Sequence, residues 1–429
     1  MLAGFIARAA VYVFYQVDRA GLPPAAGGLI LLPNHPNALL DPALIRATSG
    51  RDIRFLAKST LFTGLLGPLV RASGAIPVFR KQDEGADVSR NAEMFAAVDA
   101  ALARGEAICV FPEGISHSSG KLEPLRTGAA RMALSALARG TPVQLLPVGI
   151  NPDRKAMFRS RMTVVYGQPF TVDPGARVHA VTSEIALRMR HLIVEADPQA
   201  DAALVRRIDR LYAAERPTTE SVEAAIERRR IIAAGLGRLR QDRPEWYEAA
   251  LLQLRRYDQR LRRFGLRDSA LDWNTSFADA RHFVVREVPL ALILVPLAAA
   301  ALVVFAVPYA VTAFTARLQK NPDVTATAKV LAGVVFYGLW TVLMSLATAR
   351  WLGPTAGWLT AALLPVLAAA GLFAIERETS ALRTARSWLA LRGAHANTRK
   401  RLRRHRAELA EVLDEVNRFL TQTAKGTRR

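Results

Sequence analysis

The sequence predicts an α/β domain, then a charged helical region, then C-terminal transmembrane helices. From about Gly21 to Gln168, short apolar runs alternate with segments of helical periodicity, which is typical of an α/β fold. Three apolar segments between Val288 and Ala374 are each long enough to cross a hydrocarbon core of about 30 Å. We expect five regions: an interfacial helix (1–20), the α/β domain (21–180), a charged helical region (181–286), transmembrane helices (287–376) and a basic helical tail (377–429).

The N-terminal segment Met1–Val17 is apolar and aromatic, with Arg8 near its middle. At about 17 residues it is marginal for a membrane span, and it lacks the small-residue cleavage site of a signal peptide. We therefore predict an amphipathic or hydrophobic interfacial helix, with a short span as the alternative.

Apolar runs in the α/β domain predict strands, and the periodic stretches between them predict helices. The strands are expected at 29–32, 53–56, 75–79, 107–111, 143–148 and 162–166. The helices are expected at 42–48, 61–70, 89–103 and 127–137. Cys109 lies inside an apolar run and is predicted to be a buried side chain without chemistry.

The region after the α/β domain contains long charged helical stretches, at 183–196, 219–234 and 246–264. Their arginine-rich faces are balanced by aspartate and glutamate. This pattern leaves two interpretations open, solvated helix faces or a surface apposed to a membrane.

The apolar segments at 288–311, 328–347 and 355–375 predict membrane spans, with a tight turn at Arg350–Pro354. Pro296 and Pro308 interrupt the first segment. Arginines precede that segment and a dense arginine cluster follows the third, so the positive-inside rule places both ends in the cytoplasm. We therefore predict an integral protein of the inner or cell membrane with a cytoplasmic α/β domain, two full crossings and a re-entrant first segment.

The formal net charge of +21 and the pI near 11.0 indicate a polyanionic partner. Because the basic residues flank the apolar segments, anionic membrane lipids are expected and nucleic acid is not. The sequence contains no zinc-finger spacing, basic zipper or aromatic RNA-binding signature. In the tail, Leu402, Leu409 and Leu413 form an apolar stripe, so the tail and the membrane helices are candidate surfaces for docking or homo-oligomer formation.

The stretch Asn34–Pro42 follows the first predicted strand and contains a histidine and an aspartate. His35 and Asp41 can meet only if Pro36 and Asn37 turn the chain. The alternative is that Asp41 is a helix N-cap, with Pro42 at the first helical position.

The stretch Phe111–His117 also follows a predicted strand. Strand ends of an α/β sheet meet at one edge, so Glu113 is expected near His35 and Asp41. Basic side chains in neighbouring loops suit a phosphate; these are Lys58, Arg80, Lys121 and Arg126. Three of these residues have a simpler explanation. Glu113 could be a solvated loop residue, Arg80 could pair with Asp83 and Arg126 could lie at a helix start.

Two other kinds of catalysis fit the sequence poorly. Ser116 lies in Gly114–Ser118, which lacks the final glycine of a Gly-x-Ser-x-Gly nucleophile elbow. The seven histidines are scattered without ligand spacing, so no metal site is expected. A histidine–aspartate pair without a protein nucleophile suits proton abstraction from a substrate hydroxyl, as in acyl transfer to an alcohol.

Four ordered motifs resemble those of the glycerophosphate and lysophosphatidate acyltransferases. They are Asn34-His35 with Asp41-Pro42, Gly74–Arg80, Phe111–Gly114 and Leu146–Gly149. The resemblance implies a mixed sheet flanked by helices. The His-x5-Asp spacing and the Ile115-Ser116-His117 sequence are similar to the fungal-type glycerol-3-phosphate and dihydroxyacetone-phosphate acyltransferases, which makes glycerol 3-phosphate the expected acceptor.

The resemblance implies that His35 is the general base, that Asp41 orients it, and that Arg80, Glu113 and Gly114 bind the glycerol phosphate. Their position in the same loops adds further substrate-binding candidates: Ser116, His117, Lys121 and Arg126. The acyl donor is expected to be a thioester, either acyl-CoA or acyl carrier protein, with no cofactor.

Three alternatives compete with this interpretation. A lysophosphatidate acyltransferase would use 1-acylglycerol 3-phosphate as the acceptor. A non-catalytic lipid-binding or scaffold protein could keep the fold, although the intact His35, Asp41 and Glu113 oppose this. A transporter would need charge inside its membrane helices, and the three apolar segments contain no internal charge, since Lys329 lies at the very start of the second.

Overall fold

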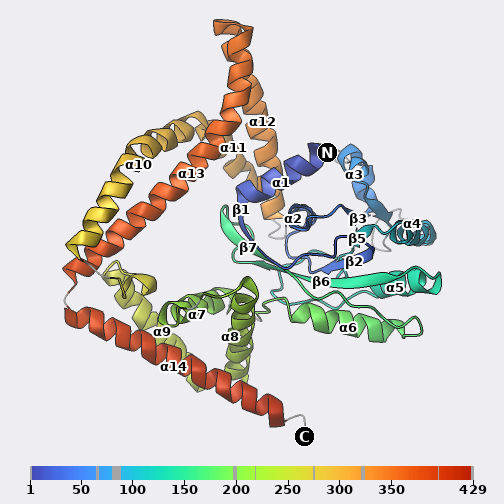
Figure 1. The fold of residues 1–429 in the computed structure, drawn as a ribbon, viewed down its shortest axis with the longest axis horizontal. Helices are drawn as coiled ribbons and strands as arrows, with labels where there is room; N and C mark the ends of the chain where they lie inside the picture. The colour runs from blue at the N-terminus through green and yellow to red at the C-terminus, as the bar shows by residue number, and fades with distance from the viewer. Residues whose placement is uncertain are drawn as a thin grey trace. The chain divides into compact units, whose positions relative to one another are not determined.

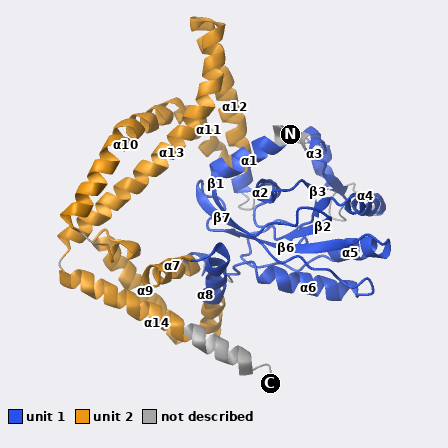
Figure 2. Cartoon of the chain, viewed as in Figure 1, with its two compact units in different colours: residues 1–203, 220–233, 320–327 blue, residues 204–219, 234–319, 328–429 orange. Residues whose placement is uncertain are grey.

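The computed structural model describes residues 2–63, 67–79, 88–196, 201–217, 219–273, 276–319, 324–394 and 396–426. The chain divides into two compact units (Figure 2). Unit 1 comprises Met1–Ala203, Glu220–Ala233 and Lys320–Thr327, and unit 2 comprises Leu204–Thr219, Ala234–Gln319 and Ala328–Arg429.

Unit 1 contains a seven-stranded mixed sheet with the order β1-β7-β6-β2-β5-β3-β4 (Figure 1). All neighbouring strands are parallel except β6 and β7, which are antiparallel. The predicted α/β fold is therefore confirmed. The strands are β1 (Tyr15–Ala20), β2 (Gly28–Pro33), β3 (Ile53–Lys58), β4 (Ile76–Val78), β5 (Ala107–Cys109), β6 (Val143–Pro152) and β7 (Ser160–Tyr166).

Strand β1 was not expected from the sequence. The N-terminal helix α1 (Leu2–Phe14) ends before the predicted Val17, and the chain continues directly into β1, which pairs with β7. Tyr15 and Ala20 at its two ends are buried, Gln16 and Arg19 are exposed, and the strand lies at the edge of the sheet. The apolar character of Tyr15 and Val17 therefore belongs to a strand and not to the helix.

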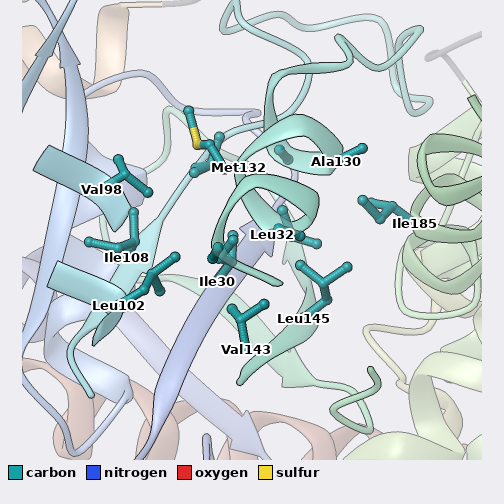
Figure 3. Packing of buried hydrophobic residues seen from close by; sticks show 14 of the residues in the cluster. Ile30, Leu32, Val98, Leu102, Ile108, Ala130, Met132, Val143, Leu145 and Ile185 are labelled. Carbon is teal, nitrogen blue, oxygen red and sulfur yellow. The ribbon is translucent and has the colours of Figure 1, made fainter. Parts of the chain in front are cut away.

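Helices α4 (Asn91–Ala103), α5 (Gly128–Ala138) and α6 (Val178–Arg190) pack an apolar core against the sheet. Unit 1 also contains α2 (Leu40–Thr48), α3 (Gly67–Ala72), the first part of α8 (Val222–Asp242) and the short 3-10 turns η1 (Ser59–Phe62) and η2 (Val88–Arg90). Figure 3 shows Ile30 and Leu145 of the sheet packed near Leu102 of α4, Met132 of α5 and Ile185 of α6. This burial fixes the sheet from which the site loops emerge.

The topology brings two loops to one edge of the sheet. Strands β2 and β5 are neighbours and parallel, with Leu31 opposite Cys109. The loops that follow them, 34–39 and 110–127, therefore leave the sheet at the same edge. The predicted proximity of these two loops follows from this pairing. Cys109 itself is fully buried, as predicted.

Unit 2 is helical. A basic tail helix, α14 (Ala396–Gly426), packs on α9 (Pro244–Arg263) and contacts α7 (Asp201–Glu215) and the 3-10 turn η3 (Asp268–Ala270). Leu402 and Leu409 are buried. At these positions other helices of the same chain cover the apolar stripe of the tail. Of the two alternatives for the stripe, docking within the chain is the one seen here.

Three helices of the described residues are long and apolar enough to cross a membrane: α10 (Phe277–Val304), α12 (Thr325–Leu352) and α13 (Pro354–Gly393). A shorter helix, α11 (Ala306–Arg317), follows α10. Helix α10 continues through Pro296 and ends next to Phe305, so the predicted interruption at Pro296 is wrong and the break lies near Pro308. Each proline removes one backbone hydrogen bond, and packing of α10 along α13 supports the helix where that bond is missing.

Candidate active site

His35 and Asp41 form a hydrogen-bonded pair at the end of β2. The Nδ1 atom of His35 lies 2.8 Å from Oδ2 of Asp41. The chain turns between them, and Ala38 takes a left-handed φ of 46°. The His35 ring also stacks on Phe111, with ring centroids 4.0 Å apart and planes 22° apart. The imidazole is therefore held from two directions, and Nε2 is the nitrogen left for a substrate.

Asp41 is not the N-cap of α2. The cap position is Leu39, and the carboxylate turns back to the preceding loop, where Oδ2 also accepts from the backbone NH of Asn37 at 2.7 Å. The cap interpretation is wrong because this loop offers a histidine and an amide as closer partners. Asp41 is 0% exposed, and burial raises the pKa of its carboxyl above the usual 3.8 against the opposing effects of His35, Asn37 and Lys155.

Glu113 joins the loop after β5 to the loop after β2. Its Oε1 accepts from the backbone NH of His35 at 2.8 Å, and its Oε2 accepts from the backbone NH of Glu123 at 2.9 Å and contacts Nε2 of His117. With 2% exposure, this is a buried carboxylate and not a solvated loop residue. Its two oxygens are engaged by protein groups, so it organises both loops.

Gly114 follows with a left-handed φ of 74°, which a side chain would strain. A Cβ at this position would lie 3.3 Å from Cγ of Arg126. Glycine therefore lets Arg126 approach the turn closely. The backbone NH of Arg126 donates to the carbonyl of Pro112 at 2.7 Å, which fixes the position of the Arg126 backbone beside the turn.

Two further contacts fasten the loops together. The Ser116 hydroxyl accepts from the backbone NH of Ala38 at 2.8 Å. The backbone NH of His117 donates to the carbonyl of His35 at 3.1 Å, and the His117 ring also contacts Ser119. Ser116 and His117 therefore lie beside the histidine–aspartate pair, and both take part in holding the loops.

The predicted phosphate-binding cations do not all lie in this cluster. Arg126 and Lys121 are exposed near the second loop, and Lys58 ends β3. Within the described part of the chain, the guanidinium of Arg126 has no ion pair or hydrogen bond. Arg80 lies outside the described residues. The structure thus gathers His35, Asp41, Glu113, Gly114, Ser116 and His117 in one cluster, with Arg126 at its border.

Sequence reasoning missed four residues that shape this cluster. Phe111 supports the His35 ring, and the Asn34 side chain bonds both the NH and the carbonyl of Ile150 on β6, at 2.7 and 3.0 Å. Lys155 and Tyr15 contact the loop after β2 from distant parts of the chain. Phe111 and Asn34 belong to the recognised motifs, which was a usable signal. For Lys155 and Tyr15 the sequence offers none. The described residues contain no cluster of three or more histidine, cysteine or acidic side chains suited to a metal ion.

Residues 16–151 match the model of a family described as Acyltransferase. The chain is 27% identical over 277 residues to glycerol-3-phosphate O-acyltransferase 1 of Saccharomyces cerevisiae, which covers 57% of this chain and 36% of that protein. It is 38% identical over 85 residues to glycerol-3-phosphate O-acyltransferase 2 of the same yeast, covering 19% and 11%. An uncharacterized acyltransferase of Schizosaccharomyces pombe is 40% identical over 73 residues, covering 17% and 11%.

The matched regions span between 11% and 36% of the length of these relatives. Among solved structures, the 1-acyl-sn-glycerophosphate (LPA) acyltransferase PlsC of Thermotoga maritima aligns at 20% identity with a TM-score of 0.35, over 44% of this chain and 77% of that one.

Proposed function

We propose that this chain transfers a fatty acyl group from a thioester to a glycerol phosphate hydroxyl, because residues 16–151 match the Acyltransferase family model and the chain is similar to two yeast glycerol-3-phosphate O-acyltransferases. The observation that carries the proposal is the pair of His35 and buried Asp41 at the sheet edge. Within this pair, Asp41 engages Nδ1 and leaves Nε2 for the acceptor.

The geometry supports a direct transfer without an acyl-enzyme. Nε2 of His35 removes the proton of the acceptor hydroxyl while that oxygen attacks the thioester carbonyl. The ionised Asp41 stabilises the imidazolium that forms. The tetrahedral intermediate then releases the thiolate, and the imidazolium returns the proton to the sulfur. An ester and a thiol are the products.

Glu113 and the cations take separate roles in this proposal. Because both oxygens of Glu113 accept from protein groups, its role is to order the loops around His35 and not to touch the phosphate. The phosphate would be bound by basic side chains at the border of the site, Arg126 and Lys121, together with Arg80. Gly114 supplies the turn that admits Arg126.

Glycerol 3-phosphate is the proposed acceptor, because the two named yeast relatives are glycerol-3-phosphate O-acyltransferases. The test offers the purified protein glycerol 3-phosphate, dihydroxyacetone phosphate and lysophosphatidate, each with acyl-CoA and with acyl carrier protein. We expect the highest kcat/KM with glycerol 3-phosphate. A higher value with lysophosphatidate would identify the alternative acceptor. If the parent protein transfers no acyl group with any combination of acceptor and donor, and so behaves like His35→Ala, the protein is non-catalytic.

We also propose that the α/β domain and the tail share the cytoplasmic face. Arg399 and Arg403 of α14 donate to the carbonyl of Leu271, which precedes α10. The chain before α10 and the chain after α13 therefore lie on one side, which requires an even number of crossings.

A re-entrant α10–α11 segment satisfies this requirement. Ala301 and Phe305 at the end of α10 pack with Leu364 of α13. Leu364 lies 11 residues beyond Gly353, which is about 16 Å along the helix and roughly half of a hydrocarbon core. In this arrangement α10 reaches the middle of the membrane and α11 returns.

Single cysteines in a Cys109→Ala background test this topology. An impermeant thiol reagent outside sealed cells should label a cysteine at Thr355, at the start of α13, and spare cysteines at Ser269, Gln319 and Glu411. Labelling at Gln319 from outside would show that α10 crosses completely.

A further inference from the structure

The loop between β6 and β7 carries a lysine that reaches the loop of the general base. We propose that Lys155 is a positioning residue, which holds the His35 and Asp41 loop in its reactive geometry by bridging it to the loop after β5. This inference rests on the proposed acyl transfer. Lys155 lies beyond the four sequence motifs, six residues after Gly149, and nothing in its local sequence marks it.

The bridge is made by the ammonium group. Nζ of Lys155 donates to the carbonyl of Pro36 at 3.0 Å and also to the hydroxyl of Ser118. Pro36 directly follows His35, and Ser118 directly follows His117. One side chain therefore joins the two loops next to His35 and His117, which Glu113 also joins. The positive charge also favours the ionised form of Asp41 and opposes the rise of its pKa.

The backbone of Lys155 makes a second link to the same pair. Its carbonyl accepts from the hydroxyl of Tyr15, whose oxygen accepts from Nδ2 of Asn37 at 2.6 Å. The backbone NH of Asn37 then donates to Oδ2 of Asp41. Tyr15 and Asn37 are both buried, so this chain of hydrogen bonds is shielded from water. Lys155 thus reaches the loop directly at Pro36 and through Tyr15 at Asn37.

The β6–β7 loop is itself anchored, which gives Lys155 a fixed support. The backbone NH of Arg159 donates to the carbonyl of Phe14 at 2.6 Å, and its guanidinium donates to the carbonyl of Tyr12 at 2.7 Å, so Arg159 caps the end of α1. Arg159 holds a left-handed φ of 57°, a conformation that persists only where several contacts impose it. At the other end of the loop, Asp153 pairs with Arg229 of α8 at 3.2 Å.

These contacts argue against Lys155 as the main phosphate ligand. An ammonium group has three N–H donors, and two of them are already directed at Pro36 and Ser118. Loss of the side chain should therefore disturb the chemical step more than acceptor binding. A misplacement of about 1 Å can cost on the order of 100-fold in rate.

The first test compares Lys155→Met, Lys155→Arg and Arg154→Met. Arg154 is the exposed neighbour of Lys155, so its variant loses the same charge from the same loop. For Lys155→Met we expect kcat to fall about 10- to 100-fold, with the acceptor KM within about threefold of the parent. Lys155→Arg should recover most of kcat, because a guanidinium can make the same bridge, and Arg154→Met should match the parent. An acceptor KM raised more than about tenfold with unchanged kcat would overturn the proposal and make Lys155 a phosphate ligand.

The second test needs no acceptor and so separates this proposal from the proposed function. Diethyl pyrocarbonate modifies accessible imidazoles, and peptide mass spectrometry can compare His35, whose side chain is 17% exposed, with the exposed His179 as an internal reference. When the bridge is lost in Lys155→Met, His35 should react about three times faster or more relative to His179, while Lys155→Arg should match the parent. An unchanged ratio in a Lys155→Met protein of parental melting temperature would contradict the positioning role, even if no acceptor were turned over.

Discussion

Two buried charged side chains, Asp41 in unit 1 and Arg406 in unit 2, are compensated differently. Asp41 is 0% exposed, and burial outweighs its partners and raises the pKa of its carboxyl. Arg406 is 4% exposed, and although burial would lower the pKa of its guanidinium, the hydrogen bonds with Asp272 and Glu215 together outweigh burial and raise it. Desolvation is the larger influence at the first site, and pairing is the larger at the second.

The hydrogen bonds explain this difference. Nε, NH1 and NH2 of Arg406 bind Glu215, the carbonyl of Asp268 and Asp272, each at 2.6 Å. Oδ1 of Asp41 has no hydrogen-bond partner among the described residues. A guanidinium whose three nitrogens are all bonded fixes how α14 docks on its own unit, whereas an incompletely compensated carboxylate lies beside the imidazole of the proposed base. Buried charge thus indicates chemistry at Asp41 and architecture at Arg406.

The largest expected effect comes from removing the imidazole. His35→Ala should lower acyl transfer by on the order of 10²- to 10⁴-fold, because the acceptor hydroxyl loses its base. Initial rates with the best acceptor measure this, with Arg154→Met as the control. Turnover by His35→Ala within tenfold of the parent would contradict the chemical role assigned to His35 and Asp41.

Removing the buried charge of Arg406 should affect stability and not the rate of acyl transfer. We expect Arg406→Met to lower the free energy of unfolding of unit 2 by about 2 to 3 kcal/mol, below the loss typical of fully buried pairs because the side chain of Asp272 is 48% exposed. The urea midpoint for protease cleavage within α14 measures it. Arg404→Met is the matched control, since that side chain is 75% exposed on the same helix. Equal midpoints for the two variants would contradict an architectural role for Arg406.

An unpaired arginine at the site should behave differently from the paired Arg406. Arg126→Ala should raise the KM for the acceptor by roughly tenfold to a hundredfold and leave the KM for the thioester near the parental value, because a charge-assisted bond to phosphate is worth about 1.5 to 3 kcal/mol. Arg80→Ala is predicted to act in the same way. Arg131→Ala, at an exposed position on α5, is the control. An unchanged acceptor KM would return Arg126 to the reading of a structural arginine.

The smallest expected effect concerns the stability cost of Asp41. Because its folded-state pKa is raised, the protonated carboxyl is favoured in the folded protein, and ionisation at neutral pH destabilises the fold. Asp41→Asn should therefore melt at or above the parental temperature at pH 7, while its transfer rate falls less than that of His35→Ala. The gap in melting temperature should close as the pH falls toward 3.8 and the parental Asp41 takes up its proton. If Asp41→Asn melts below the parent at pH 7 and the difference disappears in acid, ionised Asp41 stabilises the fold and the prediction is wrong.

Local patterns in the sequence determined the α/β class, the long apolar helices and the turn that joins His35 to Asp41. Apolar runs such as Leu29–Leu32 bury on both faces of the sheet, and six residues suffice for a histidine and an aspartate to meet across a proline turn. These signals lie within a few residues of one another, so periodicity and turn chemistry can report them. The same patterns also produced the N-cap interpretation of Asp41 and the helical interpretation of Tyr15, which local rules alone could not reject.

Only the tertiary structure decided which partners complete the site. Tyr15 meets the carbonyl of Lys155 across 140 positions of sequence, and Glu113 meets the backbone of His35 across 78. Such contacts depend on the order of β1, β7, β6, β2 and β5 in the sheet, which no local periodicity encodes. Burial is likewise a property of the packed sheet, and it sets the pKa of Asp41 and the distinction between a reactive charge and a structural one.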